Sequence, residues 1–121
     1  MDEAKIIETF HLNWNNFPEV VKLTRKDKTV VATNKAGIRQ GIQLGSNCCD
    51  ELPLEKHKGC MADEAIKTGE CIYDRKITGE NDLIRFWIPL CGAGDYYLHF
   101  LIGFHVKLDP EYYAALRAEK H

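Results

Sequence analysis

Cysteine is the residue type in this chain best suited to chemistry, because thiolates bind soft metal ions and react with oxidants. Cys49, Cys60 and Cys71 follow one another at equal intervals. The sequence has no pair of cysteines separated by two residues, the spacing that many zinc and iron–sulfur sites use. Three alternatives therefore stay open: a zinc or iron–sulfur site built from these cysteines with His57 as a further ligand, a reversible disulfide or sulfenate sensor that uses Cys49 and Cys60, or free thiols that pack as small hydrophobic side chains.

Two histidines near the end of the chain have a charge that could change near neutral pH. His99 and His105 alternate with apolar side chains. In a β-strand such alternation places them on the face opposite to the apolar side chains, or at a partner interface. The sequence alone shows no aspartate or glutamate that would pair with either histidine, so we assign neither of them a catalytic role.

Motifs for the common enzyme chemistries are missing from the sequence. It contains no GxSxG, no HExxH, no glycine-rich phosphate loop and no pair of carboxylates spaced for acid–base work. A small cysteine-dependent enzyme would still need partner groups that no motif supplies. We therefore expect no enzyme activity.

Composition sets the class of protein. The chain has 121 residues, of which 45% are hydrophobic and 28% charged, which suits one compact domain with a core of its own. Its net charge is −2, and it has no stripe of clustered lysine and arginine, which argues against a nucleic-acid or acidic-membrane partner. No apolar run approaches the roughly 20 residues that span a bilayer, and the N-terminus does not resemble a secretory signal. We expect a cytoplasmic protein with reduced thiols.

The clearest structural pattern lies in the last third of the chain, where apolar and polar side chains alternate. Such alternation is typical of a half-buried β-strand, and a second run upstream repeats it. A turn at residues 92–95 joins the two runs into an antiparallel hairpin. Trp87 alternates with the apolar side chains, so we expect it to be exposed on the other sheet face. The apolar stripe consists of Ile84, Phe86, Ile88, Leu90, Leu98, Phe100, Ile102, Phe104, Val106 and Leu108.

The other elements follow from local signals. Asn34 is typical of a helix N-cap, and Gly69 is typical of the position just after a helix. The expected elements are an amphipathic helix at residues 3–14, strands at 20–23 and 29–33, helices at 34–39 and 59–68, a strand at 71–77, and a tail helix that begins at Asp109-Pro110. This order predicts an α+β fold with helices packed on one face of the sheet.

Several segments resemble one known family, the PAS sensor domains, from Phe17 to Leu108. Residues 17–23 and 26–37 are similar to the first hairpin of that family, whose second strand runs into an asparagine, here Asn34. Residues 45–70, with Cys49 and Cys60 and a Thr-Gly-Glu helix end, resemble a cysteine-bearing subset. The resemblance implies a five-stranded antiparallel sheet with helices on one face and an N-terminal amphipathic helix.

The resemblance also implies a function: a sensory, signal-transducing module that binds a small ligand between its sheet and its helices. The identity of any cofactor is left unknown. His57 lies just before the helix that carries the axial imidazole in haem-binding PAS proteins, so a haem sensor is an alternative. The residues expected to line the ligand pocket are Ile42, Leu44, Leu52, Met61, Ala65, Ile66, Phe86, Ile88, Phe100 and Ile102.

The chain is expected to divide into an N-terminal helix at 1–16, the sensor domain at 17–108 and a tail helix at 109–121. The amphipathic pattern at residues 3–14 predicts a homodimer that forms through this helix, and an effector protein is a further expected partner.

Overall fold

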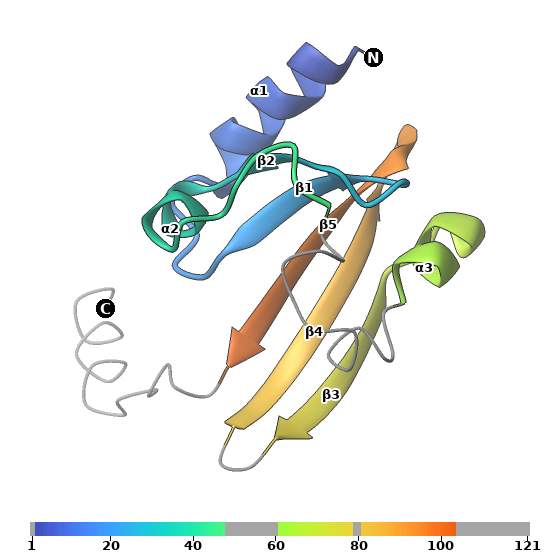
Figure 1. Ribbon diagram of the computed structural model, residues 1–121. Coiled ribbons are helices and arrows are strands. Elements are labelled where there is room, and N and C mark those ends of the chain that lie inside the picture. Colours follow the sequence, from blue (N-terminus) through green and yellow to red (C-terminus); the bar gives the residue numbers. More distant parts are fainter. Residues whose placement is uncertain (1, 48–60, 79–80, 104–121) are drawn as a thin grey trace, which may run out of the picture.

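The computed structural model describes residues 2–47, 61–78 and 81–103. Its elements are α1 (Glu3–Trp14), β1 (Val21–Arg25), β2 (Val30–Thr33), α2 (Lys35–Arg39), α3 (Ala62–Thr68), β3 (Ile72–Thr78), β4 (Asn81–Leu90) and β5 (Ala93–Gly103). The five strands form one antiparallel sheet in the order β2-β1-β5-β4-β3 (Figure 1). The predicted α+β fold with a five-stranded antiparallel sheet and an N-terminal helix is confirmed.

Local capping explains where the helices begin and end. The side chain of Asp2 accepts a hydrogen bond from the Lys5 amide (2.8 Å) and so begins α1. Asn34 caps α2 in the same way, through the Gly37 amide (3.1 Å). Gly69 ends α3 in the left-handed conformation, with φ of 70°, which glycine adopts without a steric penalty.

The final hairpin is tighter than the sequence pattern suggested. β5 begins at Ala93, so only Cys91 and Gly92 lie between the last two strands, and Gly92 takes a φ of 82°. The predicted turn at 92–95 was therefore too long, because β5 pairs with β4 up to Ala93. The predicted continuation of this strand beyond Gly103 lies outside the described residues.

Two strands that are far apart in the sequence, β1 and β5, pair in the middle of the sheet. β1 pairs with β5 in the register Val21↔Phe100 and Leu23↔Leu98, which places the first and last strands side by side. Side chains alternate between the two sheet faces, so directly paired residues share a face. β5 therefore presents Leu98 and Phe100 to one side and Tyr97 and His99 to the other.

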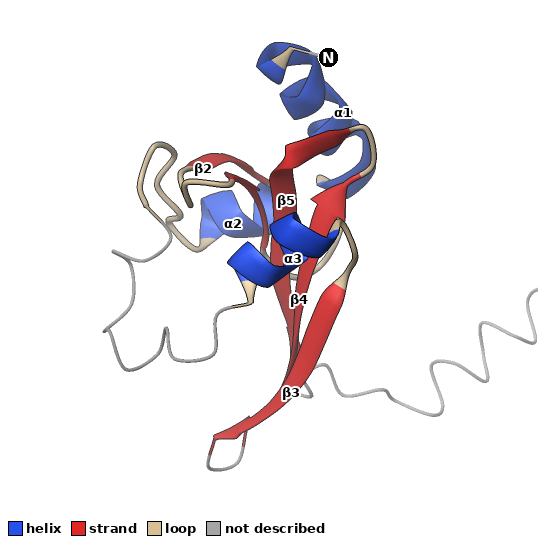
Figure 2. Ribbon diagram, turned by 90° about the vertical axis from the view of Figure 1, so that its right-hand side faces the viewer, coloured by secondary structure: helices blue, strands red, loops and turns tan. Residues whose placement is uncertain are grey.

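Helices cover both of these faces. The first, which we call the α1 face, packs under α1 in a core of Ile6, Phe10, Val21, Leu23, Ala32, Leu98 and Phe100. The second, the α3 face, packs under α3, which contacts β4 and β5 (Figure 2), in a core of Ala62, Ala65, Trp87 and Tyr97. None of the described helices is long and apolar enough to cross a membrane.

Candidate functional site

The residues expected to form one pocket lie on opposite sides of the sheet. Those contributed by strands pack on the α1 face. Those contributed by the helical segment before β3 pack on the α3 face. The structure therefore does not bring the two groups together, because the apolar stripe faces α1 rather than the middle helices. The α1-face group is Phe86, Ile88, Phe100 and Ile102, and the α3-face group is Met61, Ala65 and Ile66.

The other three residues assigned to the pocket come from the segment after α2. Ile42 is half-buried, whereas Leu44 is 61% exposed. Leu52 lies outside the described residues. This segment therefore adds no closed apolar wall within the described part of the chain.

The expected exposure of Trp87 is wrong. Its side chain is only 2% exposed, and it packs with Tyr97 against the small side chains of Ala62 and Ala65 in α3. The cause is that the sheet is covered on both faces, so a side chain opposite to the apolar stripe is not on a solvent-facing surface. Alanines on α3 let the helix approach the indole ring closely.

His99 lies beside Trp87 and has a defined tautomer. The two rings stack with centroids 5.0 Å apart and planes inclined by 16°. Nδ1 of His99 donates to the backbone carbonyl of Phe86 (2.9 Å), because a carbonyl can only accept. The pKa of His99 is lowered to about 4, chiefly by burial and then by the charges of Lys22 and Arg85, whereas the Phe86 carbonyl and Asp74 act in the opposite direction. The ring is therefore neutral at pH 7, with the lone pair on Nε2.

Arg85 brings a positive charge to the same face. Its guanidinium lies 5.0 Å from the Trp87 ring centroid, a cation–π arrangement. Two bonds join Arg85 to Asp74 on β3, one of them from Nε to Oδ1 at 2.7 Å. Such a bidentate pair fixes the guanidinium plane. The face beneath α3 thus combines a rigid aromatic surface with a paired charge.

Thr24 adds an unpaired hydroxyl to this face. It is fully buried, and within the described part of the chain its Oγ1 has no hydrogen-bond partner. Thr24 pairs with Tyr97, and Lys22 pairs with His99, so Thr24 is a diagonal neighbour of His99. A buried hydroxyl without a partner is costly, which makes this position a candidate for contact with a bound molecule or water.

Asn34 ties the loop before β1 to the sheet. Its Oδ1 accepts from the amides of Val21 and Gly37 (3.1 Å each). Its Nδ2 donates to the carbonyls of Trp14 (3.2 Å), Phe17 (3.2 Å) and Glu19 (2.8 Å). One buried amide therefore joins the end of α1, the start of β1 and the start of α2. The resemblance to PAS domains predicted an asparagine at this position, after the second strand. The structure shows that its side chain holds three segments of backbone together.

A second polar cluster holds the other end of α1. Arg25 donates from Nε and Nη2 to the two carboxylate oxygens of Glu3 (2.6 and 2.7 Å), and the Tyr96 hydroxyl donates to Oε1 (2.9 Å). The bond from Arg25 is the largest influence that lowers the pKa of Glu3. The first turn of α1 is thereby attached to both β1 and β5.

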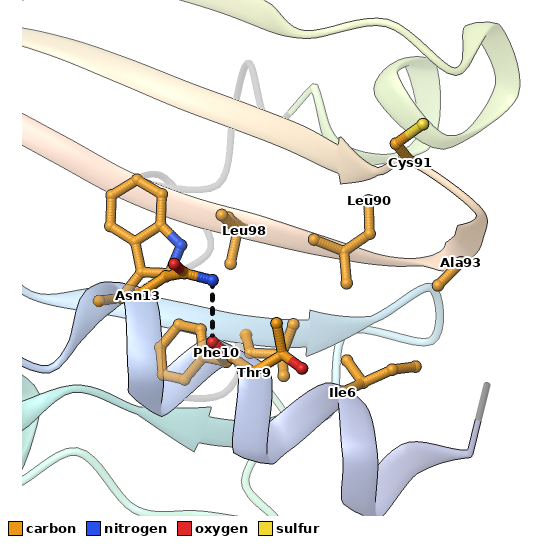
Figure 3. A pocket seen from close by; sticks show the side chains of 10 residues that line it. Ile6, Thr9, Phe10, Asn13, Leu90, Cys91, Ala93 and Leu98 are labelled. Carbon is orange, nitrogen blue, oxygen red and sulfur yellow. Dashed lines mark hydrogen bonds between the residues drawn. The ribbon is translucent and has the colours of Figure 1, made fainter.

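A groove of about 190 Å³ lies between α1 and the end of the sheet near the β4–β5 turn (Figure 3). Ile6 and Phe10 line it from the helix. Leu90, Ala93 and Leu98 line it from the strands. The walls are therefore mainly apolar, and the polar groups of Thr9 and Asn13 lie along the helix edge, joined by a bond from Asn13 Nδ2 to the Thr9 carbonyl (3.1 Å).

The predicted metal and haem ligands remain predictions. Cys49, His57 and Cys60 lie outside the described residues. Cys71 is a free, exposed thiol just before β3, and Cys91 is also free and exposed. Over residues 2–47, 61–78 and 81–103, no group of three His, Cys, Asp or Glu side chains is placed to hold a metal ion.

Sequence reasoning missed the most distinctive part of the α3 face. The alternation places Trp87 and His99 on the face opposite to the apolar stripe, whereas the predicted pocket takes its strand residues from the stripe. One pattern in the sequence could have indicated this site: Trp87, Arg85 and His99 all alternate with the apolar stripe and so lie together on the face that was expected to be polar. Thr24 carried no signal of its own, because its burial depends on pairing with β5.

Comparisons with known proteins give matches in structure alone. No protein-family model matches the sequence, and neither does any curated protein. A sensory box sensor histidine kinase from Vibrio cholerae is similar in structure, with a TM-score of 0.60 and 13% identity over 83% of this chain and 87% of that chain.

Two further structures are similar. The PAS domain of BvgS from Bordetella pertussis has a TM-score of 0.52 and 15% identity over 97% of this chain and 94% of that one. An RNA-binding light-oxygen-voltage receptor has a TM-score of 0.54 and 19% identity over 86% of this chain and 35% of that one. Together with the strand order and the helices on its two faces, these likenesses show that the chain has the PAS-domain fold.

Proposed function

We propose that this domain is a sensory module that binds a small, flat molecule on the α3 face and transmits its presence through β5 to α1. Similar folds occur in a protein described as a sensory box sensor histidine kinase and in one described as a light-oxygen-voltage receptor. Because one fold can host unrelated functions, the support must come from the residues of the site itself.

His99 is the observation that carries the proposal. Its Nδ1 is occupied by the Phe86 carbonyl, and its Nε2 has a lone pair with no hydrogen-bond partner among the described residues. The adjacent Trp87 ring is buried and stacks on the imidazole, which fixes the orientation of His99, and Thr24 supplies a second unpaired polar group on the same face. A flat molecule with an N–H or O–H donor would satisfy Nε2, since a neutral imidazole nitrogen accepts well.

β5 supplies a route from this site to α1. Residues 97 and 99 of β5 face α3, and residues 98 and 100 face α1. The Phe100 ring lies 5.7 Å from the Trp14 ring at the end of α1. A molecule that binds better when β5 adopts one of two positions would therefore shift the position of α1.

The outer side of α1 is the proposed output surface. Leu12 is 85% exposed there, whereas Ile6 and Phe10 are buried against the sheet. We propose that two copies of the domain associate through this side of α1. Light scattering at micromolar concentration should then give the mass of a dimer, and Leu12→Lys should shift the distribution toward monomer. A wild-type protein that is monomeric under these conditions would contradict the dimer.

Native mass spectrometry of protein purified without oxygen tests ligand binding itself, together with an ultraviolet–visible spectrum and metal analysis. We expect an organic molecule to stay bound to the wild-type chain. The fraction of chains that carry this molecule should be lower for His99→Gln. His11→Gln is the matched control, because His11 lies on α1 and bonds to Asn15 (2.7 Å). A molecule retained equally by His99→Gln would contradict a site at His99, and stoichiometric metal or a haem spectrum would favour the ligands predicted in the cysteine-bearing segment.

A further inference from the structure

The groove beneath α1 is distinct from the site on the α3 face, because the sheet lies between them. Its helix wall is contributed by Ile6 and Phe10, which are 3% and 4% exposed. Its strand wall includes Leu98, which is 5% exposed. These three side chains are held in the core, so the inner part of the groove has rigid walls, whereas Thr9, Asn13 and Cys91 lie exposed along its rim.

The attachments of α1 explain why a space remains there. The first turn is fixed by Glu3, which bonds to Arg25 and Tyr96, and the last turn by the Asn34 amide, which donates to the Trp14 carbonyl. The helix is thus supported at both ends, and it contacts mainly β1 and β2. The middle of α1, on the side toward β4 and the start of β5, is the part that leaves the groove (Figure 3).

The groove wall determines what kind of molecule fits. The described residues that line it include no charged side chain. Thr9 Oγ1 already donates to the Lys5 carbonyl (2.9 Å), and Asn13 Nδ2 donates to the Thr9 carbonyl (3.1 Å). Asn13 still offers its Oδ1 as an acceptor and a second Nδ2–H as a donor, and Thr9 Oγ1 can still accept, so the wall suits a neutral molecule with one donor that bonds to Asn13 Oδ1. A cavity of about 150 Å³ lined by aliphatic and aromatic side chains is known to hold benzene, so a groove of about 190 Å³ suits one substituted ring.

From these observations we infer that the groove between α1 and the β4–β5 turn is a second binding site, for a neutral, single-ring apolar molecule whose O–H or N–H donates to Asn13. Its occupant touches Phe10 and Leu98 directly, so it contacts the helix that the proposed function treats as the output element. The inference stands on the groove and does not require a ligand on the α3 face.

NMR titration with p-cresol tests this site. The chain has two tryptophans, and Trp14 lines the groove whereas Trp87 lies beneath α3. We expect saturable shifts of the Trp14 indole N–H and of the Ile6 and Leu98 amides, with little change at Trp87. Shifts confined to Trp87, or no saturable shift, would overturn the inference.

Three variants separate binding in the groove from a general effect. Ala93→Leu fills the groove from its strand wall and should abolish the p-cresol shifts, whereas Ala4→Leu, the same change on the exposed side of α1, should leave them intact. Asn13→Leu keeps the helix but removes the acceptor, so p-cresol should bind about three- to tenfold more weakly while toluene is unaffected. Persistence of the shifts in folded Ala93→Leu, or equal p-cresol affinity for Asn13→Leu and the wild type, would refute the site.

Discussion

The imidazole of His99 lies parallel to the indole of Trp87, with ring centroids 5.0 Å apart and planes inclined by 16°. The arrangement joins the middle of β5 to β4 by a side-chain stack in addition to the ladder hydrogen bonds. Arg85 lies over the same indole, 5.0 Å from its centroid. A histidine in this setting is neutral, because burial disfavours its charged form and the nearby charges of Lys22 and Arg85 add to that effect.

The first prediction concerns the stability of the protein against pH. The pKa of His99 in the folded protein is about 4, below its ordinary value of 6.5, so the unfolded chain binds the proton first as the pH falls. The contribution of His99 is therefore complete above about pH 6.5 and is lost progressively toward pH 4, by on the order of 3 kcal/mol. Urea denaturation between pH 4 and 7 should show this loss in the wild type.

The control for this prediction is the difference between variants. The fall in the free energy of unfolding below pH 6.5 should be smaller in His99→Gln, which has no imidazole to protonate, than in the wild type or in His11→Gln. Parallel pH curves for His99→Gln and the wild type would show that His99 does not titrate as described.

The second prediction concerns Asn34, whose buried amide makes five hydrogen bonds to backbone groups. Asn34→Ala leaves these groups without their partner and should lower the free energy of unfolding by about 3 kcal/mol or more. Asn34→Asp should also destabilise the fold, because a carboxylate oxygen would face the three carbonyls that now accept from Nδ2.

Chemical denaturation measures both Asn34 changes. Asn16→Ala is the surface control, since its side chain takes part in one exposed bond, from Lys35 Nζ (3.3 Å). If Asn34→Ala lost no more stability than Asn16→Ala, the account of this residue as the link between α1, β1 and α2 would be wrong.

The third prediction concerns the close contact between α2 and β2. A Cβ added to Gly37 would lie 1.7 Å from Thr33 Oγ1, which itself donates to the Val21 carbonyl (3.0 Å). Gly37→Ala should therefore lower the free energy of unfolding by about 1–3 kcal/mol, because the helix must move away from the strand. Gly94→Ala is the matched change, since nothing lies within 4 Å of its Cβ position. Equal thermal midpoints for the two variants would contradict the packing of α2.

The fourth prediction concerns the attachment of α1. The pKa of Glu3 is lowered mainly by its bond from Arg25, so the carboxylate is charged at neutral pH and its contribution is lost only as the pH falls through that lowered value. Glu3→Gln should raise hydrogen exchange in the first turns of α1 at pH 7. Glu8→Gln, on the exposed side of the same helix, should not. Unchanged exchange in Glu3→Gln would mean that the cluster does not hold the helix.

Local signals predicted the elements of this fold well. The Asn34 cap, the Gly69 helix end and the alternation around Phe100 act within a few residues, and α1, α2, α3 and the strands lie close to their expected positions. Which strands would be neighbours could not be read in this way. The pairing of β1 with β5 joins residues far apart in the sequence, and only that pairing buries Thr24.

The candidate site was harder to predict for a related reason. Alternation shows that the two faces of a strand differ, but it does not say which helix covers each face. Here the strand residues Phe86 and Phe100 face α1. Trp87 and His99, which alternate with them along the strands, face α3. Trp87, a large aromatic residue among the otherwise more polar side chains of that face, is the clearest sign in the sequence that this face is also covered.

The most direct test of the α3-face site uses indazole, a neutral, flat bicyclic molecule with an N–H donor, and 1-methylindazole, which lacks that donor. The two indole N–H signals report the two faces separately, Trp87 beneath α3 and Trp14 beneath α1, and Trp14→Phe assigns them. We expect indazole to shift the Trp87 signal saturably, 1-methylindazole to bind more weakly, and His99→Gln to remove the difference between them. Saturable binding that moves only Trp14, or equal affinity for the two compounds in the wild type, would contradict a ligand site at His99.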